Sequence, residues 1–304
     1  MKKISLIGAP TDIGASELGA SLGPDALRIA GLSQALVSRG YEIAQDYNLS
    51  GPPNPNQPNT NGSRHLKEVV VWNKLIHSAV QQALQSNQLP FLLGGDHCLA
   101  IGSIAAVAQH CKQQGKKLKV IWFDAHTDAN TPSISPSGNI HGMPVAVLLG
   151  YGHEILTEIV KDPLSIDQIS QIGIRSVDDE ERLFVQNLGL DVFDMRYIDE
   201  VGVRQAMLNS LKQCDQNTHL HVSFDLDSLD PSIAPGVSTA VKGGLSYREI
   251  QLCMELIADT GLLRSVDLVE LNPTRDIANE TARLAVELIE SLFGKSTLIR
   301  QTPT

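Results

Sequence analysis

Short apolar runs alternate along this chain with longer segments in which apolar residues recur every three or four positions. Such runs at residues 4–7, 91–93 and 120–123 are predicted to form buried strands. Further strands are predicted at residues 169–174, 191–193, 219–224 and 263–270, where polar residues are interspersed. The helical spacing predicts helices over residues 69–80, 99–107, 143–149, 204–211, 247–257 and 277–293, and the acids at 178–181 lead another. This alternation predicts one α/β domain, residues 1–304, around a parallel sheet.

Two segments near the N-terminus are less regular. Pro24 is well placed for a helix start, and Ile29, Leu32 and Leu36 would then share one face of that helix. Residues 48–62 are rich in Asn, Pro and Gly, which predicts a surface excursion without a core of its own.

The composition favours a large buried core, because 42% of the 304 residues are hydrophobic and 19% are charged. The formal net charge of −10 would repel nucleic acid and acidic membrane surfaces, so neither is an expected partner. No apolar stretch reaches the roughly 18 residues that span a bilayer. The four cysteines form no CxxC pair and no framework spacing, as expected for reduced thiols in the cytoplasm.

Acidic and imidazole side chains follow the strand predicted at residues 120–123. Asp124, His126 and Asp128 occupy every second position, so they would lie on one face if the extended conformation persisted to Asp128. These residue types bind hard or borderline metal ions. The triplet alone is equally compatible with a solvated strand end, and other segments must decide between the two interpretations.

Three further predicted strands end in polar side chains: Asp96 and His97, the pair Asp225 and Asp227, and Glu270. The carboxyl ends of parallel strands meet at one edge of an open sheet, so we expect these residues to converge with the first triplet. So many carboxylates would repel one another strongly without cations, and one ion is too few for them. The pattern therefore predicts a site for two divalent ions.

The ligand types narrow the choice of metal. Carboxylates and imidazoles without thiolate suit Mn²⁺, Fe²⁺ or Zn²⁺ better than Ca²⁺. Two such ions about 3.5–4 Å apart would hold a bridging water and lower its pKa, which gives a hydroxide nucleophile near neutral pH.

Three segments resemble the signatures of the arginase/agmatinase (ureohydrolase) family, namely Gly-Gly-Asp-His at 94–97, Asp-Ala-His-Thr-Asp at 124–128 and Ser-Phe-Asp-Leu-Asp-Ser-Leu-Asp-Pro at 223–231. They come in the family's order and at its usual separation, and the similarity runs from residues 7–10 to 270–273. The resemblance implies a three-layer α/β/α fold with a central, mostly parallel sheet. It also implies two Mn²⁺ ions per subunit and assembly as a homotrimer or homohexamer.

The resemblance assigns six metal ligands by motif position. One Mn²⁺ would be held by His97, Asp124, Asp128 and Asp225, and the other by Asp124, His126, Asp225 and Asp227. Asp124 and Asp225 would then bridge the two ions. All six ligand positions are filled here, which argues against a metal-free, non-catalytic relative.

The loop after Asp128 resembles the arginase version of this loop, in which amides and hydroxyls bind the α-carboxylate of arginine; the matching residues here are Asn130, Ser135, Ser137 and Asn139. Agmatine has no carboxylate and would leave those donors unpaired, at about 1–3 kcal/mol each if buried. Asp178 and Glu181 match positions that hold the substrate α-ammonium. The alternatives are a solvated connecting loop and an acidic first turn favoured by the helix dipole.

The remaining implied roles concern the reaction itself. Glu270 matches the residue that pairs with the guanidinium, and Thr239 matches a threonine near it. His141 matches the histidine proposed to shuttle protons to the leaving amine. The expected catalytic residues are therefore His141, Glu270 and Asp128.

Some positions depart from the family pattern. Cys98 stands where Ser usually follows the ligand histidine, Ser176 stands where arginases often have Asp, and Val-Ser-Thr-Ala at 237–240 replaces the commoner Gly-Thr-Pro ending. The expected function is hydrolysis of the small molecule L-arginine to L-ornithine and urea by an arginase-like enzyme. An agmatinase or another guanidino or formimino hydrolase is the alternative enzyme, and a non-catalytic ureohydrolase-like regulatory protein is the alternative from another class.

Overall fold

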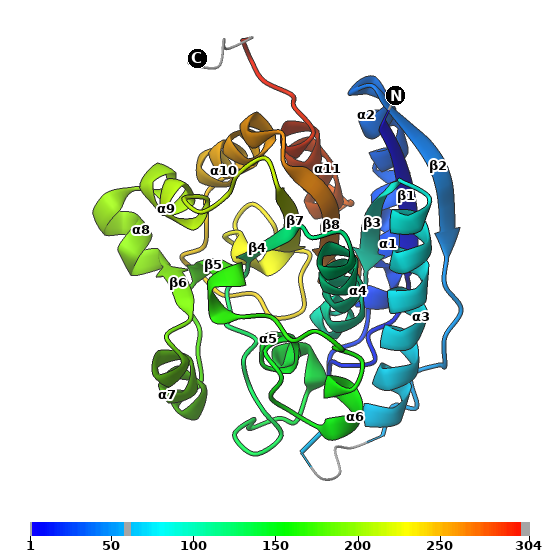
Figure 1. Cartoon of the computed structure of the whole chain (residues 1–304), viewed down its shortest axis with the longest axis vertical. Coiled ribbons are helices and arrows are strands. Elements are labelled where there is room, and N and C mark those ends of the chain that lie inside the picture. Colours follow the sequence, from blue (N-terminus) through cyan, green and yellow to red (C-terminus); the bar gives the residue numbers. More distant parts are fainter. Residues whose placement is uncertain (1, 58–61, 299–304) are drawn as a thin grey trace.

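The strands of the molecule, seen in a computed structural model that describes residues 2–57 and 62–298, form one eight-stranded sheet. Their order is β2-β1-β3-β8-β7-β4-β5-β6, and all neighbouring strands run parallel, which confirms the predicted parallel sheet (Figure 1). The strands are β1 (Lys2–Ala9), β2 (Tyr41–Asn48), β3 (Leu89–Gly94), β4 (Lys117–Phe123), β5 (Ile169–Ile174), β6 (Asp191–Asp194), β7 (Thr218–Asp225) and β8 (Leu263–Val269).

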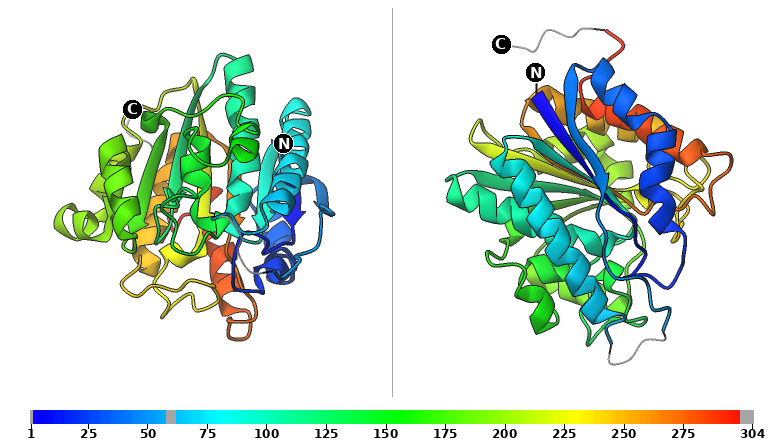
Figure 2. Two further views of the ribbon diagram at one scale, coloured as in Figure 1. Left: turned by 90° about the horizontal axis from the view of Figure 1, so that it is seen from below. Right: turned by 90° about the vertical axis from the view of Figure 1, so that its right-hand side faces the viewer.

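Helices cover both faces of this sheet, and they are α1 (Gly23–Ile29), α2 (Leu32–Ser38), α3 (Leu66–Gln85), α4 (Ala100–Gln113), α5 (Pro144–Leu148), α6 (Glu154–Thr157), α7 (Asp179–Leu188), α8 (Met195–Val201), α9 (Val203–Ser210), α10 (Tyr247–Thr260) and α11 (Glu280–Leu292). α1, α2 and α8–α11 contribute to the core on one face, and α3–α7 to the core on the other. Figure 2 shows α3 and α11 on opposite sides of the sheet, so the expected three-layer arrangement is confirmed.

Burial explains which strands the sequence reveals. Every residue of the central strand β7 is buried, and its apolar residues Leu220, Val222 and Phe224 alternate with polar residues that have buried partners. The edge strand β2 has a mixture of half-buried and exposed residues and was not predicted. Helix α8 was also not predicted, because its charged surface positions hide the helical spacing.

The helix predicted from Pro24 is interrupted, so the prediction of one face shared by Ile29, Leu32 and Leu36 was wrong. α1 ends at Ile29, whose side chain is 81% exposed, whereas Leu32 and Leu36 of α2 are fully buried. Gly31 between the two helices has φ +93°, a left-handed conformation that ends one helix and redirects the chain into the next.

The Asn/Pro-rich excursion lies against α3 where it is described, while residues 58–61 are outside the described part of the chain. Trp72 of α3 donates a hydrogen bond from Nε1 to the Pro52 carbonyl at 2.9 Å, and its ring packs against Gly51. α11 begins at Glu280 rather than at residue 277, because Ala278 and Asn279 have φ of +49° and +62°. Within the described residues, no helix has the length and apolar character needed to cross a membrane.

Candidate active site

The four strands whose ends carry the predicted polar clusters are neighbours at the centre of the sheet, in the order β3-β8-β7-β4 (Figure 1). His97 follows β3, Glu270 follows β8, Asp225 ends β7 and Asp124 follows β4. Because all four strands are parallel, these side chains meet at the same edge, as expected for a site in an open α/β sheet.

The first triplet converges by a turn and not by continuation of the strand. β4 ends at Phe123, and the N–H of His126 donates to Asp124 Oδ1 at 2.7 Å. Asp128 has φ +47°, a left-handed conformation that is costly for a residue with a side chain. The chain therefore does not stay extended to Asp128, which was the condition for the shared face, yet the turn still brings the three side chains together.

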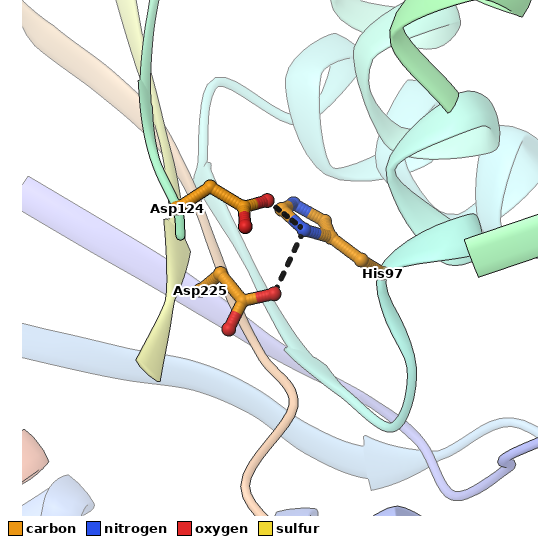
Figure 3. Close-up of side chains that lie close together, drawn as sticks. All are labelled: His97, Asp124 and Asp225. Atoms are coloured by element: carbon orange, nitrogen blue, oxygen red, sulfur yellow. Dashed lines mark ion pairs between the residues drawn. The ribbon is translucent and has the colours of Figure 1, made fainter. Parts of the chain in front are cut away.

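One ring nitrogen lies among three carboxylates. His97 Nδ1 is 3.0 Å from Asp124 Oδ2, 3.0 Å from Asp225 Oδ2 and 3.2 Å from Asp128 Oδ2 (Figure 3 shows the first two contacts). The nitrogen is buried and none of these oxygens is in hydrogen-bonding geometry with it. Four donor atoms that face one another without a directed hydrogen bond fit a metal ion.

A second potential metal-binding group shares a residue with the first. His126 Nδ1 lies 3.1 Å from Asp227 Oδ2 and 3.4 Å from Asp124 Oδ1. The ligand atoms of His97, Asp124 and Asp225 lie within 4.8 Å of one another, as do those of His126, Asp124 and Asp227. Asp124 therefore directs one oxygen toward each group, which would let it bridge two neighbouring ions.

The charges of this cluster favour bound cations. Burial and the charges of Asp227 and Asp124 raise the pKa of Asp225 well above its usual range, and burial with the charge of Asp124 raises that of Asp128 to about 7. Although burial acts in the opposite direction, Asp227 and Asp124 raise the pKa of His126 to about 12. Without metal the cluster therefore retains protons, and metal ions would take the place of that positive charge.

Two further side chains fix His97 and Asp124. Trp122 donates from Nε1 to Asp124 Oδ2 at 2.9 Å, and its ring stacks on the His97 ring with centroids 4.1 Å apart. Ser223 Oγ lies 2.9 Å from His97 Nε2. Sequence reasoning did not assign either residue to the site, although Ser223 alternates with Asp225 along β7 and so occupies the same face.

A cavity of about 130 Å³ lies over these groups. All the predicted site residues except Asp124 line it: His97, His126, Asp128, Asn130, Ser135, Ser137, Asn139, His141, Asp178, Glu181, Asp225, Asp227, Thr239 and Glu270. Gly142 and Ser176 complete the lining. The structure thus brings the ligand cluster and the loop after Asp128 together around one space.

A carboxylate–imidazole pair lies beside the ligand cluster. Glu270 Oε1 accepts a hydrogen bond from the His97 N–H at 2.9 Å and lies 3.2 Å from His141 Nδ1. Its second oxygen, Oε2, is buried without a hydrogen-bond partner, and the residue has φ +63°. Although burial acts in the opposite direction, Glu270, Asp96 and Asp128 raise the pKa of His141 to about 9, so the ring is an imidazolium at neutral pH.

The loop at the other end of the cavity is held by side-chain hydrogen bonds. Asn130 Nδ2 donates to Asp178 Oδ2 at 3.1 Å, and Asn130 Oδ1 is buried without a partner. Ser135 Oγ accepts from the Gly138 N–H at 2.9 Å, and Asn139 Oδ1 accepts from Ser16 Oγ at 2.8 Å. The amides and hydroxyls of this loop are therefore presented to the cavity in defined orientations.

Glu181, Asp178 and Thr239 contact protein groups as well as the cavity. Asp178 and Glu181 form a reciprocal capping box at the start of α7, and Glu181 Oε1 also accepts from the Ala129 N–H at 2.8 Å. Thr239 Oγ1 donates to Asp227 Oδ2 at 2.9 Å. The acidic first turn is thus a helix cap that also ties α7 to the loop after Asp128.

Asp96 joins the first loop of the chain to the site, a role that sequence reasoning did not assign. It accepts from the N–H groups of Gly14 and Cys98, and the Gly14 carbonyl accepts from the His141 N–H at 3.2 Å. A Cβ at Gly95 would lie 1.5 Å from the Thr11 carbonyl oxygen, so only glycine allows this close approach of the two segments. Burial and the charge of Glu270 raise the pKa of Asp96 to about 6.

A parallel sheet with paired carboxylate–imidazole groups at its carboxyl edge defines an α/β protein able to bind two metal ions. Residues 2–294 match the family model described as "Arginase family". The chain belongs to the arginase family, whose members depend on a binuclear metal centre.

Individual proteins agree with this assignment. The chain is 41% identical to the arginase of Bacillus caldovelox over 300 residues, covering 97% of this chain and 99% of that protein. The crystal structure of arginase from Bacillus cereus superposes with a TM-score of 0.90 at 40% identity, covering 98% of this chain and 100% of that one. Arginase from Entamoeba histolytica, solved with L-ornithine, gives a TM-score of 0.88 at 32% identity, with 97% and 98% covered.

Proposed function

We propose that this protein hydrolyses L-arginine to L-ornithine and urea with two Mn²⁺ ions. The observation that carries the proposal is the cavity itself. Two potential metal-binding groups sharing Asp124 lie at one end, and the amides and hydroxyls of residues 130–139 lie at the other. Arginine likewise carries its guanidinium at one end and its α-carboxylate at the other, so each group would face one end of the cavity.

Six side chains would hold the ions. One ion would be bound by His97, Asp124, Asp128 and Asp225, and the other by Asp124, His126, Asp225 and Asp227. Carboxylate and imidazole donors without thiolate favour Mn²⁺ over Ca²⁺. When bound, such a pair of ions lowers the pKa of water and so supplies a hydroxide nucleophile near neutral pH.

Glu270 and His141 would act on the two ends of the scissile C–N bond. The unpartnered Oε2 of Glu270 is an acceptor for guanidinium N–H groups, and its fixed position orients the guanidinium carbon toward the ligand cluster. His141 carries a proton at neutral pH because Glu270 stabilises its charged form. That proton is available to the leaving amine as the C–N bond breaks.

The far end of the cavity would bind the amino-acid part of the substrate. Asn130, Ser135, Ser137 and Asn139 would bind the α-carboxylate, and Asp178 and Glu181 the α-ammonium. Thr239 would lie near the guanidinium, where it also holds Asp227. In the same proposal residues 1–304 form a single domain that works in the cytoplasm as a homotrimer or homohexamer, without nucleic-acid or membrane partners.

A comparison of two substrates tests the proposal. Purified protein loaded with Mn²⁺ is expected to release urea from L-arginine, and far more slowly from agmatine, because agmatine leaves the carboxylate-binding donors unpaired. Equal or faster urea release from agmatine would contradict the choice of arginine but keep the hydrolase. Bound metal without urea release from either compound, or from other guanidino compounds, would favour a non-catalytic protein.

A further inference from the structure

Arg64 lies outside the cavity, on the short segment that leads into α3, and contacts the far side of the substrate loop. Its backbone N–H donates to the Gly138 carbonyl at 2.7 Å. Its Nη1 donates to Ser16 Oγ at 3.4 Å, and Ser16 Oγ in turn donates to Asn139 Oδ1 at 2.8 Å. The guanidinium of Arg64 is therefore linked through one hydroxyl to an amide that faces the cavity.

The segment around Arg64 is held in place on both sides. His65 has φ +49°, and its Nδ1 lies 3.0 Å from the Ile13 carbonyl oxygen. Gly62 has φ +72° and passes so close to the Pro132 carbonyl that a Cβ would lie 2.5 Å from the oxygen. Such constraints keep Arg64 beside the loop before any ligand binds, so its position costs little ordering entropy on binding.

The charge of Arg64 has no carboxylate partner in the part of the chain that the structure describes, residues 2–57 and 62–298. Its Nε is buried without a hydrogen-bond partner, and Nη1 contacts only the neutral hydroxyl of Ser16. The positive charge of this guanidinium is therefore not neutralised by any described carboxylate.

The cavity, in contrast, is strongly acidic. Its lining includes six carboxylates, and no lysine or arginine belongs to it among the described residues. A substrate carboxylate that enters this space beside Asp178 and Glu181 is repelled by their negative charges. A positive charge behind Asn139 would offset this repulsion for a substrate that carries a carboxylate.

We propose that Arg64 is a positioning residue for the substrate α-carboxylate: it orients Asn139 through Ser16 and supplies the positive charge behind the carboxylate-binding loop. The inference deepens the proposed function and rests on it. It predicts that Arg64 affects ligands according to their carboxylate and not according to their guanidinium.

The test compares L-arginine with L-argininamide, in which a neutral amide replaces the carboxylate. We compare kcat/KM for L-arginine with kcat/KM for L-argininamide. Arg64→Gln is expected to lower the ratio of these two values roughly fivefold to tenfold, through a higher KM for L-arginine and not through a lower kcat. L-ornithine binding to the Mn²⁺-loaded protein, measured by calorimetry, should weaken by a similar factor. Arg64→Lys, which keeps the charge, should recover most of the ratio.

Two further variants separate the charge and the hydrogen-bond route from general effects. Arg182→Gln removes an exposed charge on α7, where Arg182 pairs with Asp179, and should leave the ratio at the wild-type value. Ser16→Ala should lower the ratio in part, and adding it to Arg64→Gln should change the ratio less than the product of the two single changes. A strictly multiplicative double variant would overturn the route through Ser16.

The outcomes distinguish this inference from the function on which it rests. Wild-type protein that releases no urea from L-arginine overturns the proposed function and the inference with it. Wild-type protein that releases urea, together with an Arg64→Gln variant whose ratio is unchanged, overturns the inference alone. Equal losses for both substrates in Arg64→Gln, without recovery in Arg64→Lys, would also overturn it, because they indicate only a structural role for the loop.

Discussion

The two ends of the cavity are built in different ways. At the metal end, the candidate ligands lie on or directly after adjacent central strands, and His97, Asp124, Asp225 and Asp227 are at most 2% exposed. At the substrate end, most of the side chains come from residues 130–139, which form no helix or strand, and Ser137 is exposed. The metal end is therefore rigid through the sheet, whereas the substrate end depends on contacts between loops.

The side chains at the two ends are therefore positioned by different parts of the structure. Parallel strands in fixed register place the metal-end carboxylates within a few ångströms of one another, at the expense of strong repulsion. The substrate loop instead takes its shape from single hydrogen bonds to α7 and to Ser16. Changes at the metal end should therefore abolish binding of the ions and activity together, and changes at the substrate end should alter affinity for one class of ligand.

The largest effect is expected from removing one metal-end charge. Asp227→Asn, which keeps the size of the side chain, should lower bound manganese and reduce urea release on the order of 10³-fold or more, because it removes the negative charge and one of the two oxygens from the group with His126. His126→Ala should do the same. Metal analysis and urea release measure both quantities. Asp230→Asn is the matched control, since Asp230 accepts hydrogen bonds from Ser232, Gly243 and Gly244 outside the cavity.

A change of pH should act on the metal end and not on the neutral amides and hydroxyls of the substrate loop. The metal-free protein holds protons on His126, with a pKa of about 12, and on His97, with a pKa well above its usual value. Manganese must displace these protons, so its apparent affinity should rise about tenfold per pH unit for each proton displaced. Calorimetry in buffers of different ionisation enthalpy counts the protons, and an affinity independent of pH would contradict this account.

A smaller effect is expected from the residue that supports the ligands. Trp122→Phe keeps the ring beside His97 but loses the hydrogen bond to Asp124 Oδ2, and should lower manganese affinity about 10- to 100-fold. Trp72→Phe is its control, because Trp72 donates to Pro52 outside the site. Equal manganese affinities for the two variants would show that the Trp122 hydrogen bond does not support the metal end.

The smallest effect is expected at the substrate end. Asn130→Ala removes the Nδ2 donor that is proposed to contact the α-carboxylate, together with its hydrogen bond to Asp178, and should raise KM for L-arginine about tenfold with little change in manganese affinity. Steady-state kinetics and metal analysis on the same sample give both values. Loss of manganese in this variant would mean that the two ends are not independent.

Much of the fold could be predicted because its central strands are buried on both faces. β3 and β4 contain continuous apolar runs, whereas polar residues are interspersed along the buried strands β7 and β8. Each of the four ends in, or is followed by, polar residues that mark the carboxyl edge. β2 could not be predicted in this way, since an edge strand with polar residues has no continuous apolar run. The interruption of the first helix at Gly31 depends on a left-handed backbone that the periodicity of Ile29, Leu32 and Leu36 conceals.

The residues of the candidate site likewise fall into those that strand spacing predicts and those that it does not. Spacing along the strands suggested that Asp124, Asp225 and Asp227 would meet, although the turn that brings Asp128 to them could not be derived from an assumed extended chain. The residues of the substrate loop could be named only through the family resemblance. The contacts of Trp122 and Ser223 with His97, of Asp96 with Gly14 and of Arg64 with Ser16 join distant segments, and no local pattern of the sequence indicates them.

The central claim is that two ions held by the shared Asp124 act on arginine in this cavity. Stepwise addition of Mn²⁺ to metal-stripped protein, with bound manganese and urea release from L-arginine measured on the same samples, tests it most directly. We expect two ions per chain and urea release that reaches its maximum only as the second site fills. Full urea release with one ion per chain, or without bound manganese, would contradict the account.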